Sequence, residues 1–374
     1  MNPTIKDITR LLEQDTPLTY AEDFDNVGLL VGNPNTPVSK VLITLDTTLD
    51  VLEEAIQTGC NLVISFHPII FSGLKKITGR NYVERIVMKA IENKIAIYAP
   101  HTALDNQWEG VNGKICDLLN LNDRQILLPK KETLLKLSTY IPSDHLETVK
   151  EALFAAGAGH IGNYSSCSFS FQGTGTFKGS NNSTPAIGKP NVLENILEHN
   201  LQVIVPKHAK NNVIAALNKS HPYEEVAFDL FKIENSNHRI GLGMVGSLES
   251  PIKESEALEL LKNIFNTSII RHSGFLGKSV QRIAVLGGSG AFAINAAKTA
   301  GADLFVTSDL KYHDFFKAEK TIVLADIGHY ESEKFTKNRI KTLLYRKIHI
   351  FASKFNPFDV ILSKVNTNPV EYFI

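Results

Sequence analysis

Three short apolar runs decide how this chain folds: VLITLD at Val41–Asp46, NLVISFH at Asn61–His67 and IAIYAPH at Ile95–His101. They are separated by helix-length amphipathic segments at Asp50–Thr58 and Tyr82–Asn93. Apolar strands that alternate with helices are typical of βαβ units and a buried parallel sheet. The sequence therefore predicts an α/β fold for the first third of the chain.

The last quarter of the chain repeats this pattern. Strand-like runs at Arg282–Gly287 (RIAVLG), Asp303–Asp309 (DLFVTSD) and Thr321–His329 (TIVLADIGH) are each followed by a helical segment. We therefore expect two similar α/β lobes, 1–128 and 236–374, that together form one core.

The middle of the chain, 129–235, has a different order of elements. The predicted elements are a strand at Leu135–Ile141, a helix at Ser143–Ala156, hairpin strands around Ser165–Phe177, a helix near Val192–His199, a strand at Leu201–Val205, a helix at Ala209–Lys219 and a strand at Glu225–Ile233. This order resembles a ferredoxin-like α+β module. Because lobe-like sequence flanks it on both sides, we expect it to be an inserted domain.

Composition excludes several classes of protein. Lys plus Arg and Asp plus Glu both total 39 in 374 residues, so the formal charge is zero. A neutral chain has no general attraction to nucleic acid or to an anionic membrane. Three cysteines are too few for a disulfide framework, and no apolar run of about 18 residues predicts a membrane span. We expect a soluble, cytoplasmic protein.

Polar residues gather where the predicted parallel strands end, which is where α/β sheets bind their ligands. The residues at or just after these ends are His67, His101, Asp105, Asp309, His313, His329 and Glu333. His329 and Glu333 are four residues apart and share one face of a helix. Imidazole and carboxylate together suit a divalent ion such as Zn, Fe or Mn.

If the two lobes fold together, four of these side chains could converge on one or two ions. The candidate ligands are His67, Asp105, His329 and Glu333. The alternative is that a single strand-end histidine is structural and that a His-x-x-x-Glu pair lies on the surface. Repetition at the same topological position in both lobes favours the metal site.

The glycine run Gly287-Gly288-Ser289-Gly290 opens a predicted helix after a strand. Such a run could bind a phosphate group at the helix N-terminus. It lacks the spacing of a dinucleotide fingerprint or a P-loop, so a tight turn that needs positive φ is the alternative.

Several ordered motifs resemble one known family. They are EDFDNVGLLVG at 22–32, SFHPIIF at 65–71, His101-x-x-x-Asp105 and GHYESE at 328–333. Together they look like the GTP cyclohydrolase 1 type 2 homologs, also called Nif-three-like dinuclear-metal-centre hexamers. The middle segment, with HPYEEVAFDLF at 221–231, resembles the PII/CutA-like insert of the longer members.

The resemblance implies a dinuclear metal site between the lobes and a toroidal homohexamer. By position, its metal ligands are the four residues already named, with Asp105 and Glu333 as candidates to bridge two ions. His101 falls where the family keeps a histidine beside the metals, which makes it the candidate catalytic residue, as a proton shuttle or substrate contact. Phe66 departs from the family, which usually has a second histidine at that position, so two-metal chemistry is in doubt here.

These features point to a metal-dependent, hydrolase-like protein that activates water against a small molecule, such as a purine nucleotide or a phosphoester. The alternative is a regulatory or metal-handling hexameric scaffold whose PII-like domain senses a ligand. Nucleic acid is the poorer partner because the net charge is zero.

Overall fold

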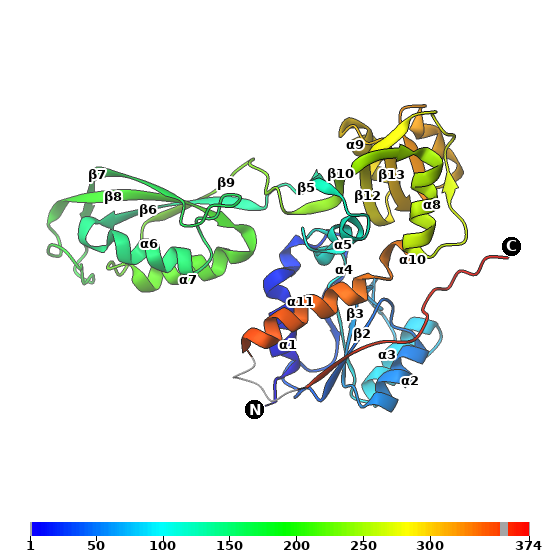
Figure 1. Cartoon of the computed structure of the whole chain (residues 1–374). Coiled ribbons are helices and arrows are strands. Elements are labelled where there is room, and N and C mark those ends of the chain that lie inside the picture. Colours follow the sequence, from blue (N-terminus) through cyan, green and yellow to red (C-terminus); the bar gives the residue numbers. More distant parts are fainter. Residues whose placement is uncertain (1, 352–357, 374) are drawn as a thin grey trace. The chain divides into compact units, whose positions relative to one another are not determined.

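The computed structural model describes residues 2–351 and 358–373, and tertiary contacts divide the chain into two units (Figure 1). The first unit comprises Met1–Pro129 together with Arg239–Ile374, and the second is Lys130–His238. The second unit covers nearly the same residues as the insert expected at 129–235.

The first sheet of the first unit contains the three apolar runs that open the chain. Its strand order is β1-β4-β3-β2-β15, with bounds β1 Gly28–Val31, β2 Lys40–Thr44, β3 Leu62–Ser65, β4 Ala96–Ala99 and β15 Asp359–Leu362. Strands β15, β2, β3 and β4 are parallel neighbours, and β1 pairs antiparallel with β4. Helices α2 (Leu49–Thr58) and α3 (Tyr82–Glu92) connect them, as the amphipathic segments predicted.

The second sheet contains the three runs of the last quarter. Its order is β11-β14-β13-β12-β10-β5, with bounds β5 Asn122–Pro129, β10 Gly241–Lys253, β11 Arg271–His272, β12 Ser279–Ser289, β13 Leu304–Ser308 and β14 Val323–Asp326. Strands β12, β13 and β14 are parallel neighbours. The mixed α/β class is confirmed.

Two strands pair across the lobe borders expected from sequence. Strand β5 precedes the insert but pairs with β10, and β15 follows the second sheet but pairs with β2. Helices that fill the space around both sheets are α1 Ile5–Asp15, α5 Val111–Leu118, α8 Glu254–Phe265 and α11 Thr336–Phe351. Buried residues of both sheets and of these helices, such as Ile64, Val306 and Ile340, belong to one hydrophobic cluster. The two sheets therefore share a core.

The second unit is one antiparallel sheet with two helices on one face (Figure 1). Its strand order is β7-β8-β6-β9, with bounds β6 Leu134–Pro142, α6 Leu146–Ala155, β7 Ser168–Lys178, β8 Leu193–Pro206, α7 Lys210–Ser220 and β9 Phe228–Lys232. Leu137, Leu201 and Val213 are among the buried residues that join sheet and helices.

One predicted helix of the second unit is wrong. A helix was expected near Val192–His199, but β8 runs as one strand from Leu193 to Pro206. Its N-terminal part pairs with β7 and its C-terminal part also pairs with β6, so interstrand hydrogen bonds override the local pattern. The expected hairpin around Ser165–Phe177 is likewise a single strand, β7, whose partner is β8.

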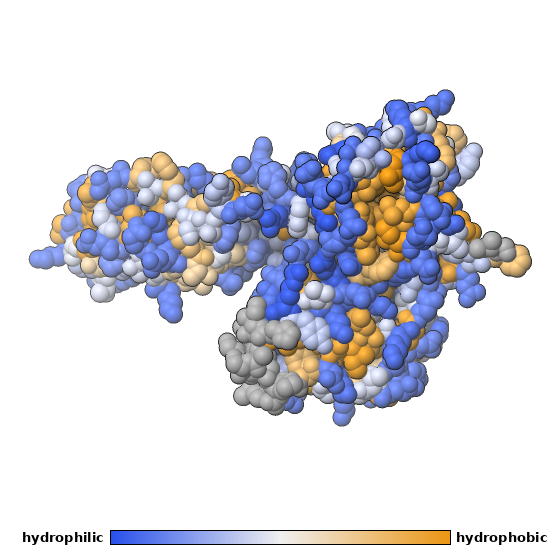
Figure 2. Space-filling view, viewed as in Figure 1, coloured by the Kyte–Doolittle hydropathy of each residue, from blue (hydrophilic) through white to orange (hydrophobic). Residues whose placement is uncertain are grey.

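The described part of the chain contains no helix that could span a membrane. Among residues 2–351 and 358–373, no helix combines the length and the apolar character needed to cross a bilayer. On the face shown in Figure 2, each unit has hydrophilic residues over much of its surface, with smaller hydrophobic areas among them.

Candidate metal centre

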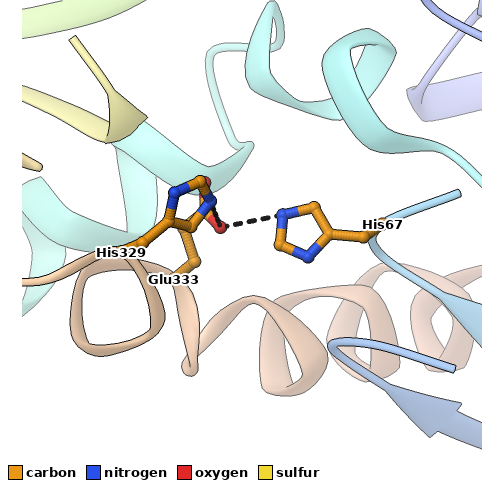
Figure 3. Close-up of side chains that lie close together, drawn as sticks. All are labelled: His67, His329 and Glu333. Carbon is orange, nitrogen blue, oxygen red and sulfur yellow. Dashed lines mark ion pairs between the residues drawn. The ribbon is translucent and has the colours of Figure 1, made fainter. Parts of the chain in front are cut away.

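Three of the four predicted ligands come together in the first unit. His67 follows β3, while His329 and Glu333 are the first and last residues of α10 (His329–Glu333), which follows β14. Their ligand atoms all lie within 4.8 Å of one another. Oε2 of Glu333 is 3.0 Å from Nε2 of His67 and 3.1 Å from Nε2 of His329, and Figure 3 shows this carboxylate lying between the two rings.

Each histidine is oriented by an aspartate that follows the neighbouring parallel strand. Nδ1 of His67 is 2.8 Å from Oδ1 of Asp46, and Nδ1 of His329 is 2.6 Å from Oδ2 of Asp309. A ring whose Nδ1–H donates to a carboxylate turns its Nε2 lone pair towards the other side, as metal-binding histidines do. Both Nε2 atoms therefore face Glu333.

The Glu333 carboxylate is the best evidence that the cluster holds a cation. Its side chain is only 4% exposed, and within the described residues no hydrogen-bond donor satisfies Oε2. With neutral imidazoles, three electron-pair donors would point at one another without any positive charge. A buried carboxylate in this state is costly unless a proton or a metal ion lies between the ligands.

Without a metal, protons must fill that role. Burial alone would lower the pKa of His67, but the carboxylates of Glu333 and Asp46 outweigh it and raise that pKa to about 10. The pKa of His329 is raised to about 11, again against burial, by Asp309 and Glu333. Burial would raise the pKa of Glu333, yet the two imidazoles lower it to about 2. The three groups thus form a strongly coupled acceptor for positive charge.

The glycine run explains how a carboxylate fits so close to the backbone. Gly288 has a φ of +71°, and a Cβ there would lie 2.5 Å from Oε1 of Glu333. The amide of Gly288 donates to Oγ of Ser332, and the amide of Gly287 donates to Oδ1 of Asn112, both at 3.0 Å. Because side chains occupy both amides, the structure favours the tight turn over a phosphate site.

Asp105 lies beside the three-residue cluster but outside it. It is the last residue of α4 (His101–Asp105), and its Oδ1 is buried without a hydrogen-bond partner in the described part of the chain. Burial, then the negative charge of Glu333, raise the pKa of Asp105 well above its usual value. This second unsatisfied carboxylate oxygen also fits a cation, and the role of Asp105 as a ligand stays a prediction.

His101, the predicted catalytic residue, is adjacent to the cluster. Its φ is +29°, a strained conformation for a histidine, and its ring centroid is 5.3 Å from that of His67. Nδ1 of His101 is 2.8 Å from Oδ1 of Asp25, whose Oδ2 accepts hydrogen bonds from the amide and hydroxyl of Thr102. Burial would raise the pKa of Asp25, but the bonds to His101 and Thr102 lower it. His101 is thus held firmly beside the metal ligands.

Phe66 occupies the position next to His67 with an apolar ring. It is fully buried, and its ring centroid lies 4.8 Å from that of His67 and 5.5 Å from that of His101. The space where a second imidazole could bind an ion therefore holds a side chain that cannot coordinate metal.

A cavity of about 490 Å³ opens onto the cluster, and a segment near the C-terminus forms one of its walls. His67, Asp309 and His329 line it together with Asn368 and Tyr372. In the same segment, Oγ1 of Thr367 donates to Oδ2 of Asp46 at 2.6 Å, which holds the aspartate that orients His67. Asn368 also donates to Oε1 of Glu331 at 3.1 Å.

Sequence reasoning missed several members of this site. Asp46 was assigned only as the end of a strand, and Asp25 only as part of a motif; the 363–373 segment had no assigned role. The available signal was that Asp46 and Asp309 stand at the ends of strands next to those that carry the histidines. His313, noted in the sequence, is not brought to the cluster; its ring packs against those of Tyr312 and Phe316.

Comparisons with known proteins agree with the motifs. The family model for Duf34/NIF3 (NGG1p interacting factor 3) matches residues 3–369. A relative from Halalkalibacterium halodurans named "GTP cyclohydrolase 1 type 2 homolog" is 39% identical over 98% of both chains. One of the same name from Bacillus subtilis is 38% identical over 98% of this chain and 97% of its own.

A solved structure has the same fold. The crystal structure of a Bacillus cereus protein related to NIF3 superimposes with a TM-score of 0.88 at 37% identity, covering all of both chains. The resemblance drawn from the four sequence motifs is confirmed.

Proposed function

The chain belongs to the Duf34/NIF3 family, and we propose that it is a metal-dependent, hydrolase-like protein acting on a small molecule. The observation that carries this proposal is the buried Oε2 of Glu333, which faces Nε2 of two histidines and has no donor of its own in the described residues. The curated relatives' name brings purine nucleotides into consideration as substrates, and phosphoesters suit the same ligands.

In this proposal one divalent ion, Zn, Fe, Mn or similar, is held by His67, His329 and Glu333, with Asp105 as a fourth ligand. Three oxygen and nitrogen donors plus a nearby carboxylate match the ligand number and type of such sites. A second ion would need an imidazole where Phe66 stands, so we propose one ion per chain.

A divalent ion at this place supplies Lewis-acid activation of water at neutral pH. Side chains of the protein orient the ligands, move the proton and bind the substrate. Asp46 and Asp309 keep the ligating rings in position through Nδ1. Nε2 of His101 accepts or returns a proton, because its Nδ1 is committed to Asp25. Arg271, ion-paired with Asp326 in the cavity wall, is placed to meet an anionic substrate group.

The second unit and the assembly complete the proposal. The element order β6-α6-β7-β8-α7-β9 with sheet order β7-β8-β6-β9 supports a ferredoxin-like, PII/CutA-like insert between the lobes 1–128 and 236–374. A homohexamer and a cytoplasmic location, both implied at the sequence level, belong to the same proposal.

A non-catalytic role is the second candidate, and Phe66 is the observation that favours it. Its ring replaces an imidazole beside His67, which removes one ion from the two-metal arrangement. The chain would then be a regulatory or metal-handling hexameric scaffold with a ligand-sensing insert.

Metal analysis combined with a hydrolysis screen separates the two candidates. The purified full-length chain is measured for bound metal, stripped with a chelator, reloaded with Zn, Mn or Fe(II), and assayed on purine nucleotides and phosphoesters. We expect bound metal and chelator-sensitive turnover. Bound metal without turnover on any substrate supports the scaffold instead.

The double variant H329A/E333A tests the ligands in the same assays. It should lose both metal and turnover, whereas H313A/E319A, which removes a histidine and a glutamate of the same sheet region outside the cluster, should keep both. Unchanged metal content in H329A/E333A would overturn the site.

A further inference from the structure

The second unit contains a cavity of its own, of about 530 Å³, on the sheet face opposite its helices. Leu137 and Leu201 turn towards α6 and α7, whereas Tyr140, Asn200 and Phe171 line the cavity. Asn200 pairs laterally with Tyr140 on one side and with Phe171 on the other, so the three side chains share one face. The loop after β7 closes over it through a hydrogen bond from the amide of Thr184 to Glu224 at 2.9 Å.

Two glycines on β7 create the space. A Cβ at Gly173 would meet no atom within 4 Å, so the position borders open volume. A Cβ at Gly175 would lie 1.9 Å from Oε2 of Glu198, so its absence makes room for that carboxylate. The Gly-Thr-Gly sequence of this strand thus serves the cavity and its carboxylate.

The carboxylate of Glu198 is buried in this cavity and only half satisfied. The residue is 9% exposed, and Oε1 accepts a hydrogen bond from the hydroxyl of Tyr223 at 2.8 Å. Among the described residues no hydrogen bond to Oε2 is found, and this oxygen is not fully enclosed, so it is open to the cavity. Tyr223 is held in place by its amide, which donates to Nδ1 of His221 at 3.1 Å. A carboxylate oxygen that is open to the cavity and has no donor from the protein is available to accept a hydrogen bond from a ligand.

The rest of the lining selects the charge of that ligand. Four aromatic residues, Tyr140, Phe171, Phe177 and Tyr223, line the cavity together with Glu198. Aromatic faces attract cations, most strongly where water is excluded. Glu224 and Glu225 add negative charge to the lining against the single ammonium of Lys178, so an anionic ligand is disfavoured.

We propose that this cavity binds a small organic cation, an amine or amidinium, whose N–H groups donate to Glu198 and whose body packs between the aromatic rings. The site lies wholly in the second unit and does not depend on the metal centre. Charge-assisted hydrogen bonds to a carboxylate fix the cationic end, and the aromatic walls favour a flat or apolar remainder.

Three probes of the same shape and different charge test the proposal on the full-length chain. They are benzamidine, which is a cation, benzamide, which is neutral, and benzoate, which is an anion. Calorimetric or NMR titration should show benzamidine binding at millimolar concentration, at least about tenfold tighter than benzamide, with benzoate weakest. Equal binding of the three, preference for benzoate, or no binding of benzamidine overturns the proposal.

Two variants locate the binding. Glu198→Gln keeps the shape of the side chain and should remove the preference for benzamidine over benzamide. Gly173→Ile fills the open volume from a strand position with ordinary φ and should weaken all three probes. Glu147→Gln removes a carboxylate that is 74% exposed on α6 of the same unit and should bind as the parent chain does.

If Glu198→Gln does not fold, Gly173→Ile alone tests whether benzamidine binds in this cavity. Benzamidine affinity unchanged in a folded Gly173→Ile variant places the probe elsewhere and refutes the assignment.

Discussion

The two halves of the candidate metal centre repeat one arrangement and differ in the residues that accompany it. In the first sheet, Asp46 after β2 holds His67 after β3, and in the second sheet Asp309 after β13 holds His329 after β14. The paired residues are 21 and 20 positions apart, and each pair bridges neighbouring parallel strands. The shared arrangement is a carboxylate–histidine pair at the carboxyl edge of a sheet.

The halves differ in what comes next along the chain. The second half adds Glu333 one helical turn after His329, which gives it two of the three clustered ligands. The first half places Phe66 beside its histidine and supplies His101 with Asp25 instead. Its histidine is also less exposed, 22% for the His67 side chain against 42% for His329. In the proposed function, the second half would therefore supply most of the metal ligands, and the first half would supply the groups around the ion that take part in the chemistry.

The largest effect is expected for Glu333→Gln, because Glu333 serves both halves. The amide keeps the shape but removes the charge that both Nε2 atoms face, so metal affinity should fall by more than about 100-fold. Competition with a fluorescent chelator measures it. Gln substitution at Glu331, the neighbouring carboxylate on α10, should have a much smaller effect; equal losses would mean that Glu333 is not a ligand.

A smaller loss of metal affinity is expected for Asp46→Asn and Asp309→Asn, which change the two aspartates that orient the histidines. Each substitution should lower metal affinity by about 10- to 100-fold, since the amide no longer fixes the histidine tautomer. Asp46→Asn should lower metal affinity more than Asp309→Asn, because Asp46 also accepts a hydrogen bond from Thr367 and contacts the more buried histidine. The same chelator competition ranks them, and the reverse order would contradict the comparison of the halves.

Phe66→His should make the halves more alike. An imidazole beside His67 restores a donor for a second ion, so bound metal per chain should rise from one to two. Elemental analysis after reloading and desalting gives the count. Phe66→Leu, which changes the ring without adding a donor, should stay at one, and a parent chain that already binds two ions would defeat the proposed single site.

The smallest expected effect is the pH dependence of the stability of the metal-free protein. The folded pKa values of His67 and His329, about 10 and about 11, lie above the ordinary 6.5 of the unfolded chain. Their stabilising contribution is therefore complete below about pH 6.5 and is lost as pH rises towards 10–11. Melting temperature should fall over this range in the chelated protein and fall less in Glu333→Gln. A flat profile in both would show that the two rings are not charged.

Much of the first unit could be predicted because its strands are continuous apolar runs. Leu62–Ser65 and Val323–Asp326 are buried on both faces, which leaves little choice of structure. The histidines could be found for the same reason, as polar residues that end such runs.

The remainder depends on partners distant in the chain. Val192–His199 was predicted to be helical, but it pairs with β7 and, at Glu198 and His199, also with β6, so the sheet decides its conformation. Asp46 contacts His67 because β2 and β3 are adjacent strands. Thr367 reaches Asp46 because β15 returns to the first sheet.

This return of the chain sets the order of events during synthesis. Strand β15 pairs with β2, and Thr367 bonds Asp46, a residue made 321 positions earlier. The first sheet and its half of the centre thus stay incomplete while the insert and the second sheet are being translated. If the cluster binds a metal as proposed, its first half is complete only after the C-terminal segment has been made, and a fusion attached close to residue 373 would disturb metal binding more than one attached ahead of α1.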